Sequence, residues 1–421
     1  MTNSKSSVST QHPINHPNNE KAIAAPMLLQ LPLSYIRFLI GMFVSRLGDS
    51  LFTFAIPWIA YKLTQSSMIM GSMYAVSVLP IVLFGPVVGS LVDRWERKKL
   101  MIVTDIARAL LVALIPILHL LGLLQLWHLY VISFMLTILS LMFDVSIVAI
   151  IPSLVPNQLT RANASYQLTN QIAELAGPLL AGALIVSIGG FNALWIDTVS
   201  FLGTLIVLIL MPSFVTPKSL TGLSQIFKDI GEGFRWLVRS KINLSFSFQA
   251  MIGNFGYSAA FGVLMFYLLN TLQLDAQQSS LNYTLLGFGG IIGSLLAVPL
   301  ENRFRRGVLI PMLLAFGTIG FLFAASSQFW LAPGLAFFAV TVCNVAWNTI
   351  VTSVRQETIP SDMIGRVLGF SRVLTRLAMP LGAMTGAALS EWADPRAVFI
   401  VAAGAKALEV IIALATPIRK L

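Results

Sequence analysis

Residues 68–99 read MIMGSMYAVSVLPIVLFGPVVGSLVDRWERKK, and they join a long apolar run to a short, highly charged segment. The run from 68 to 92 contains no Asp, Glu, Lys or Arg, and a helix needs only about 20 such residues to cross the hydrocarbon of a bilayer. The segment from 93 to 99 carries four basic and two acidic side chains. Because cytoplasmic loops retain positive charge during membrane insertion, this stretch predicts a transmembrane helix that enters a cytoplasmic loop.

The rest of the chain repeats this pattern. Of its 421 residues, 56% are hydrophobic and 10% are charged, far from the roughly 25% charged residues of a soluble domain. We therefore predict an all-α membrane protein with twelve transmembrane helices in two pseudo-symmetric bundles of six. The expected spans are residues 35–63, 68–92, 100–122, 127–151, 164–188, 191–211, 242–269, 281–300, 308–325, 329–354, 367–389 and 397–416.

Polar segments divide the chain further. Residues 212–241, between the two sets of spans, place apolar residues at helical spacing among basic ones, which is typical of an amphipathic helix on a membrane surface. Gly89 and Gly293, like Pro156 and Pro360, are 204 residues apart, which supports two related bundles. The expected parts are a disordered cytoplasmic tail (1–33), a first bundle (34–211), a cytoplasmic linker (212–241), a second bundle (242–417) and a cytoplasmic tail (418–421).

Topology explains the net charge of +10. If both termini lie in the cytoplasm, only Lys62 and Arg396 of the 27 Lys and Arg residues fall in outer loops. The basic residues do not gather on a solvated face with stacking aromatics, so we expect no nucleic-acid partner. The single cysteine, Cys343, excludes a disulfide within the chain, and we expect neither a metal nor a cofactor.

The charged segment after the second span resembles the signature loop of the major facilitator superfamily. The residues at matching positions include Gly89, Asp93, Arg94, Arg97 and Lys98. One position departs, because Glu96 stands where the family usually has glycine. Together with Asp105 and Arg108, the matching residues form the expected gating motif, whose contacts would break when the cytoplasmic side opens. The simpler alternative is that their positive charge only fixes topology.

Further resemblance points to the drug-exporter branch of this superfamily, which includes macrolide efflux and siderophore export proteins. It is carried by S-x-x-G-D at residues 45–49, D-x-x-R at 105–108, the loop at 151–163, Asp197 with Ser200 and Phe201, and Gln356, Pro360, Gly365 and Arg366.

The fifth predicted span resembles a motif associated with antiporters. Residues 176–182 read AGPLLAG, and the match lies at Gly177, Pro178 and Gly182. Ala181 and Leu168 depart from the motif, since glycine is expected at both positions. Ordinary close packing of helices is the alternative explanation.

Ionisable residues within spans indicate function, because each costs roughly 2.5 to 3.5 kcal/mol to insert and tends to face a cavity or a partner. A spacing of three residues pairs Arg46 with Asp49, Asp105 with Arg108, and Lys406 with Glu409. The residues without a local partner are Asp144, Glu174, Asp197, Arg372 and Arg376. A dry environment favours the protonated form of a carboxyl, so the proton-coupling candidates are Asp49, Asp144, Glu174 and Asp197.

The candidates for substrate binding combine charge with aromatic surface. Arg372 and Arg376 are four residues apart and share one helical face, which suits a substrate with a carboxylate or phosphate group. Alternatively, they neutralise acids of the other bundle across the cavity. Arg46, Trp58 and Trp347 complete the set, although aromatic residues are also common at membrane interfaces.

The combined prediction is a secondary active transporter in a bacterial inner membrane, with both termini in the cytoplasm. The resemblance implies a single chain that exports a small amphipathic molecule, such as an antibiotic, a drug or a siderophore, in exchange for protons by alternating access. The alternative is an uncoupled facilitator or flippase for a lipid or metabolite. A membrane enzyme or receptor is disfavoured, because the sequence has no nucleophile elbow, phosphate loop or metal-ligand cluster.

Overall fold

Long helices make up nearly all of the structure. The computed structural model describes residues 31–92, 95–156, 158–211, 223–360 and 363–421, and these contain no strand. The helices of the first half are α1 (Leu33–Thr64), α2 (Ser67–Val92), α3 (Arg97–Leu120), α4 (Leu126–Leu154), α5 (Leu159–Ile188) and α6 (Gly190–Leu210). Those that follow are α7 (Leu223–Arg239), α8 (Lys241–Phe266), η1 (Tyr267–Thr271), α9 (Ala276–Arg303), α10 (Arg306–Ser326), α11 (Ala332–Thr358), α12 (Ile364–Trp392), α13 (Ala397–Ala415) and η2 (Pro417–Lys420).

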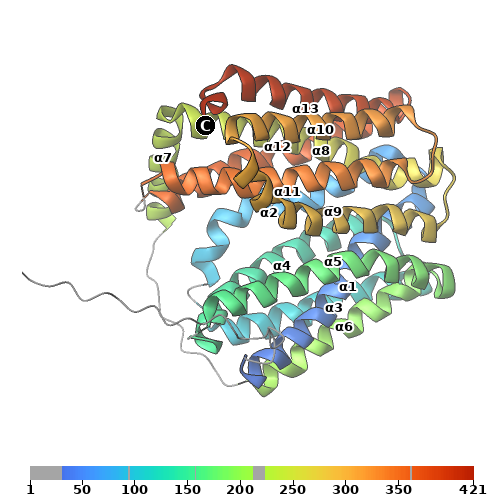
Figure 1. Cartoon of the computed structure of the whole chain (residues 1–421). Coiled ribbons are helices and arrows are strands. Elements are labelled where there is room, and N and C mark those ends of the chain that lie inside the picture. Colours follow the sequence, from blue (N-terminus) through green and yellow to red (C-terminus); the bar gives the residue numbers. More distant parts are fainter. Residues whose placement is uncertain (1–30, 93–94, 157, 212–222, 361–362) are drawn as a thin grey trace, which may run out of the picture.

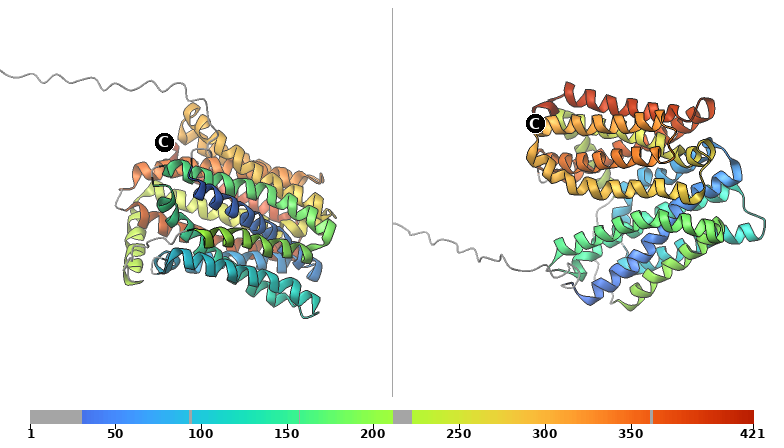
Figure 2. Two further views of the ribbon diagram at one scale, coloured as in Figure 1. Left: turned by 90° about the horizontal axis from the view of Figure 1, so that it is seen from below. Right: turned by 45° about the vertical axis from the view of Figure 1, so that its right-hand side comes forward.

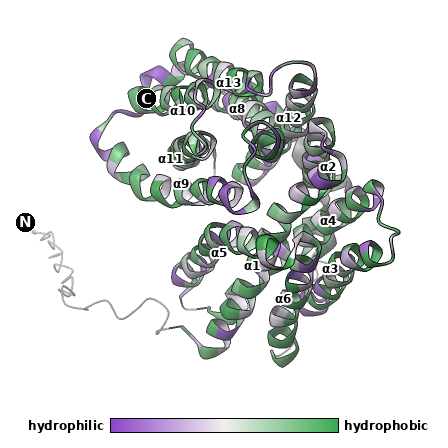
Figure 3. Ribbon diagram, turned by 90° about the vertical axis from the view of Figure 1, so that its right-hand side faces the viewer, coloured by the Kyte–Doolittle hydropathy of each residue, from purple (hydrophilic) through white to green (hydrophobic). Residues whose placement is uncertain are grey.

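Eleven of the described helices are long and apolar enough to cross a membrane, which confirms the predicted all-α, multi-pass architecture. Helices form here because backbone groups inside a bilayer can pair only with one another. The remaining long helix, α12, has 29 residues, but Arg366, Arg372 and Arg376 interrupt its apolar sequence. It packs against α8 and α2 among the spanning helices. Figure 3 shows that hydrophobic residues dominate the helices, and many large ones are exposed, as contact with lipid requires.

The helices form two groups that meet mainly through three pairs of helices. In Figure 1, α1 and α3–α6 lie in the lower group, α8–α13 lie in the upper group, and α2 reaches the upper group. The main contacts between halves are α2 with α12 and α8, and α5 with α9. Small residues allow this close approach, because a Cβ on Gly71 would collide with Ala387 of α12, and one on Gly182 would collide with Ser280 of α9.

Contacts between α2 and α12 gather at one end of the molecule. The start of α1, α7 and the C-terminus all lie at the other end, which we call the α7 end (Figures 1 and 2). Opposite the α7 end, Ser67 Oγ lies 3.3 Å from the backbone oxygen of Ala387, and the Tyr61 hydroxyl donates to Oδ1 of Asn270 at 3.3 Å. Nearer the α7 end, a Cβ on Gly85 of α2 would meet nothing within 4 Å. Because Gly71 has a close neighbour on α12 and Gly85 has none, we infer that the two helices part toward the α7 end.

Helix α7 packs against α12, although the sequence predicted a helix that lies on the membrane surface. Its Gly233 approaches the backbone of Arg366, and Glu232 accepts a hydrogen bond from that arginine at 2.6 Å. Leu237 is also buried, whereas Arg235 and Arg239 are exposed. The side chains of Leu223, Ile226, Phe227 and Ile230, which contributed to the helical spacing, lie outside the described part. The amphipathic helix is thus anchored to the second half.

Candidate transport site

A cavity of about 370 Å³ lies between the helices near the middle of the molecule. Its wall comes mostly from α1, α2, α3, α4 and α6 of the first half, with α8 and α9 of the second half completing it. Eight of the 23 lining residues are aromatic or contain sulfur, among them Phe52, Tyr74, Phe261, Met70 and Met73. Such a wall suits the apolar body of a small amphipathic molecule, because flexible methionines and flat rings adapt to many shapes.

Two of the charged residues that line this cavity lie on α1. Arg46 and Asp49 both line it, one helical turn apart, and their side chains form an ion pair of 3.3 Å. Arg46 also forms an ion pair with Asp144 of α4 and donates to the hydroxyl of Tyr166 at 3.2 Å. The guanidinium group of Arg46 therefore links α1 to α4 and α5.

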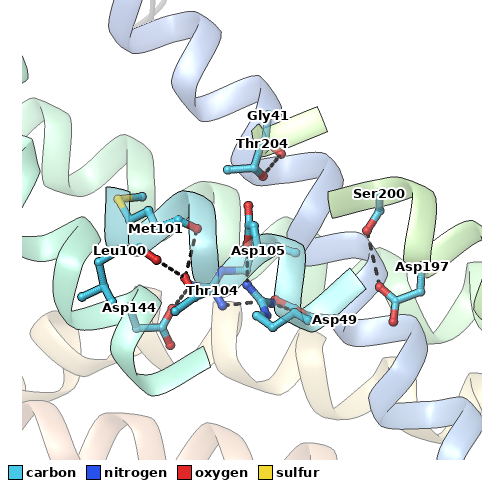
Figure 4. Close-up of polar contacts among 12 residues, drawn as sticks. Gly41, Asp49, Leu100, Met101, Thr104, Asp105, Asp144, Asp197, Ser200 and Thr204 are labelled. Atoms are coloured by element: carbon cyan, nitrogen blue, oxygen red, sulfur yellow. Dashed lines mark hydrogen bonds and ion pairs between the residues drawn. The ribbon is translucent and has the colours of Figure 1, made fainter. Parts of the chain in front are cut away.

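The second oxygen of Asp49 pairs with Arg108 of α3. Arg108 is only 1% exposed, forms a second ion pair of 3.0 Å with Asp105, and lies 4.5 Å from the ring centroid of Phe201. Figure 4 shows Asp49, Asp105 and Asp144 converging on this region. Asp49 thus accepts from two arginines at once, so its carboxylate joins α1 to α3 as well as to the Arg46 cluster.

Asp197 of α6 lies beside this network and lines the cavity. It is fully buried, and one oxygen accepts a hydrogen bond of 3.4 Å from Ser200. The other oxygen, Oδ2, has no hydrogen-bond partner among the described residues. Gly48 of α1 makes this arrangement possible, since a Cβ there would collide with the Asp197 carboxyl and the Ser200 side chain. The glycine of the S-x-x-G-D pattern therefore lets α1 lie against a buried acid.

Acids outnumber bases in this network. It holds the four carboxyls Asp49, Asp105, Asp144 and Asp197 but only two guanidinium groups. Burying unpaired carboxylates costs several kcal/mol each, by about the scale of buried ions in proteins. A proton or a cationic group near these carboxyls would reduce the excess negative charge.

The structure adds a partner for one of these acids. Asp144, which has no partner at helical spacing on its own helix, pairs with Arg46 of α1, 98 residues away in sequence, and helical spacing cannot reveal such a contact. The three local pairs are all present, including Lys406 with Glu409 at 2.9 Å. Glu174 of α5 is exposed and forms no hydrogen bond or ion pair with described residues.

The expected gating motif is only partly visible. Asp93 and Arg94 lie outside the described residues, and so does the side-chain environment at Gly89. Arg97 donates to the backbone oxygen of Ala149 at 2.9 Å, and Lys98 donates to that of Ile209 at 3.2 Å. These two basic residues therefore tie the start of α3 to α4 and to the end of α6, within the first half.

The antiporter-like segment of α5 serves two contacts. A Cβ on Gly177 would collide with Ser50 of α1, and one on Gly182 would collide with Ser280 of α9. Pro178 lies inside the helix, between these two glycines. One glycine therefore packs α5 within its own half, and the other packs it across the two halves.

Four substrate-binding candidates do not line the cavity. Trp58 packs beside Gly190 near the end opposite α7, with the Lys62 ammonium 5.5 Å from its ring centroid. Trp347 contacts the ring of Phe246 at a centroid distance of 6.4 Å. The other two candidates, Arg372 and Arg376, are exposed on α12.

Sequence reasoning missed Arg355, which it counted among the basic residues of an inner segment. The structure places it within α11, where Nη2 donates to Ser247 Oγ at 3.3 Å and to Ser371 Oγ at 3.2 Å. Its position, one residue beyond the predicted span 329–354, gave little sign of this. No cluster of His, Cys, Asp and Glu in the described part could hold a metal ion.

The fold and this site define a polytopic α-helical membrane protein of the transporter class, with two helical halves around a central cavity. The sequence profile described as Major Facilitator Superfamily matches residues 38–375 and 246–420. The chain therefore belongs to the major facilitator superfamily.

Relatives in this superfamily include several exporters. Macrolide efflux protein A of Streptococcus pyogenes is 26% identical over 366 residues, which cover 83% of this chain and 88% of that protein. The enterobactin exporter EntS of Escherichia coli O1:K1 is 28% identical over 357 residues, which cover 81% of this chain and 82% of EntS. The multidrug efflux pump Tap of Mycolicibacterium fortuitum is 22% identical, with 84% and 88% covered. The predicted similarity to drug and siderophore exporters is confirmed.

Solved structures share the fold. A bacterial homologue of the iron transporter ferroportin in an inward-facing state has a TM-score of 0.74 at 19% identity, covering 91% of this chain and 98% of that chain. Such a homologue in an outward-facing state has a TM-score of 0.58 at the same identity and coverage.

Replacing Arg108 by alanine should destabilise the first half strongly, because Asp49 and Asp105 would lose a shared buried partner. Removing one member of a buried ion pair typically costs about 3 to 5 kcal/mol. Thermal unfolding of the purified protein in detergent measures this as a lower midpoint for Arg108→Ala. The control is Arg239→Ala on the exposed side of α7, which should unfold like the wild type; equal midpoints for both variants would contradict the assigned role of Arg108.

Proposed function

We propose that this protein exports a small amphipathic molecule, such as an antibiotic, a drug or a siderophore, in exchange for protons. The observation that carries the proposal is the double pairing of Asp49, which lines the cavity and accepts from both Arg46 and Arg108. Export is also what the names of the macrolide, multidrug and enterobactin relatives describe for those proteins.

Protonation of Asp49 would change the contacts of α1 in a defined way. A neutral carboxyl no longer attracts two guanidinium groups, so Arg108 would keep Asp105 and Arg46 would keep Asp144. The bond from α1 to α3 would weaken, while each arginine would retain one acid. Proton binding is thereby linked to the position of the helix that forms the cavity wall, which is what coupling requires.

The α7 end faces the cytoplasm in this proposal, and the described conformation is open toward it. Support comes from the parting of α2 and α12 at that end and from the basic residues of α7. The higher TM-score of the inward-facing ferroportin homologue, compared with the outward-facing one, agrees with this orientation. The protein would work as a single chain in the inner membrane of a bacterium.

Proton coupling is tested with inverted membrane vesicles that contain a pH-sensitive dye. Addition of a transported compound, sought first among macrolides and catecholate siderophores, should release protons from vesicles holding wild-type protein. Asp49→Asn removes the titrating group, so it should abolish this proton release while Glu357→Gln, at an exposed residue near the α7 end, should leave it unchanged. Substrate movement that continues unaltered after collapse of the proton gradient would instead indicate an uncoupled facilitator.

Orientation is tested by labelling single cysteines in intact cells with a membrane-impermeant maleimide. In a Cys343→Ala background, Arg396→Cys should react, because residue 396 lies at the end opposite α7. Arg239→Cys, on the exposed side of α7, should react only after the membrane is made permeable. Labelling of residue 239 in intact cells would show that the α7 end faces outward.

A further inference from the structure

Three arginines of the second half, Arg355, Arg372 and Arg376, lie near one another and have no acidic ion-pair partner among the described residues. The side chain of Arg355 is held by hydrogen bonds to Ser247 and Ser371, and Ser371 directly precedes Arg372 on α12. Arg376 follows one helical turn later. The charges of Arg355 and Arg372 oppose each other, as do those of Arg372 and Arg376. The second half therefore places Arg372 within electrostatic range of two other guanidinium groups, Arg355 and Arg376, and their charges repel that of Arg372.

Three other basic residues of the second half have acidic partners. Arg306 pairs with Glu301 at 2.7 Å, Arg366 with Glu232 at 2.6 Å, and Lys406 with Glu409 at 2.9 Å. In contrast, Arg355, Arg372 and Arg376 form no ion pair with any residue in the described part of the chain. Unpaired charges at membrane depth are expensive and are retained where they meet a ligand or a mobile partner.

The position of two of these arginines is fixed by the packing of α12. Arg372 and Arg376 precede Ala383 and Ala387 by eleven residues each, so all four lie on one helical stripe. Ala383 and Ala387 pack against Gly71 of α2 at the end opposite α7. Toward the α7 end, α2 and α12 part. The stripe of α12 that packs against α2 at the opposite end therefore presents Arg372 and Arg376 to the space between the halves.

We propose that Arg355, Arg372 and Arg376 form an anion-binding site for a carboxylate or phosphate group that enters from the α7 end. Guanidinium groups suit such anions because each presents several donors in a planar fork. The role of the site in recognising cargo rests on the proposed transport function, whereas anion binding itself does not.

Arg355 distinguishes this site from a simple gate between halves. A gate would need side chains that reach across to acids of the first half, such as the exposed Glu174 or Asp144, as the sequence alternative suggests. The guanidinium group of Arg355 is instead hydrogen-bonded to two serines on α8 and α12, and these contacts hold its side chain within the second half. Its remaining donors stay beside Arg372, which concentrates positive charge on the second half alone.

The test uses three probes with one skeleton: 1-naphthoate, 1-naphthylmethanol and 1-naphthylmethylamine. Calorimetric titration of the purified full chain in detergent should show that the anion binds at least about tenfold more tightly than the neutral alcohol, as expected for charge-assisted hydrogen bonds. This wild-type comparison needs no variant that might misfold. Equal affinity for the anion and the alcohol would overturn the proposal.

Variants locate the site. Arg372→Gln combined with Arg376→Gln should reduce naphthoate affinity about tenfold or more and leave binding of the alcohol unchanged. Arg239→Gln, at an exposed arginine of α7, should bind both probes like the wild type. If the double variant binds naphthoate as well as the wild type does, the assignment fails. A charge swap gives a second way to contradict the assignment. If Arg372→Asp abolishes transport, and the added substitution Asp144→Arg restores transport without restoring naphthoate binding, then Arg372 acts as a gate residue that pairs with Asp144.

The natural source of the anion is settled by repeating the titration in nanodiscs. Weaker naphthoate binding in nanodiscs that contain phosphatidylglycerol than in phosphatidylcholine alone would identify a lipid headgroup as the competitor. Equal binding in both would indicate a soluble anionic ligand. Either result supports the site. Failure of proton coupling in the dye assay would leave these binding results intact, so the two proposals can fail separately.

Discussion

Charges buried inside a bilayer are costly unless they meet a partner, and the first half of this protein gathers its buried charges around one carboxylate. Asp49 shares its two oxygens between Arg46 and Arg108, and each arginine holds one further acid. Four helices, α1, α3, α4 and α5, are thereby joined through ionised groups rather than through shape alone. In the proposed mechanism, protonation of Asp49 rearranges these contacts along the cavity wall and so links proton binding to conformation.

Small residues let the helices pack closely, and close contacts of this kind can change when the ion pairs rearrange. Gly48 brings α1 against Asp197, while Gly71 and Gly182 let helices of the two halves touch. Lipid supplies no hydrophobic drive between helices, so these contacts depend on close packing and can be exchanged at modest cost. The halves are therefore held firmly at one end and separated between α2 and α12 at the other, an arrangement that suits alternate opening of a central path.

Most of the fold could be predicted from the sequence because a bilayer imposes simple lengths and polarity on each span. The helix α12 was also expected, as a span over 367–389, although its arginines weaken the apolar signal that marks the other spans. Local ion pairs such as Arg46 with Asp49 were predicted because helical spacing fixes them. The partner of Asp144 was not, since it depends on how α1 meets α4, and no sequence pattern records that contact. Arg355 was missed for the same reason, because its role depends on packing among α8, α11 and α12.

The central claim is that the charge of Asp49 sets the spacing of the two halves at the α7 end. Spin labels at the exposed positions Ser153→Cys of α4 and Thr352→Cys of α11, in a Cys343→Ala background, allow this distance to be measured by double electron–electron resonance. The account predicts a distance distribution that shifts with pH, and an Asp49→Asn variant that shows the low-pH distribution at every pH. A wild-type distribution that does not respond to pH, or an Asp49→Asn variant that responds as the wild type does, would contradict it.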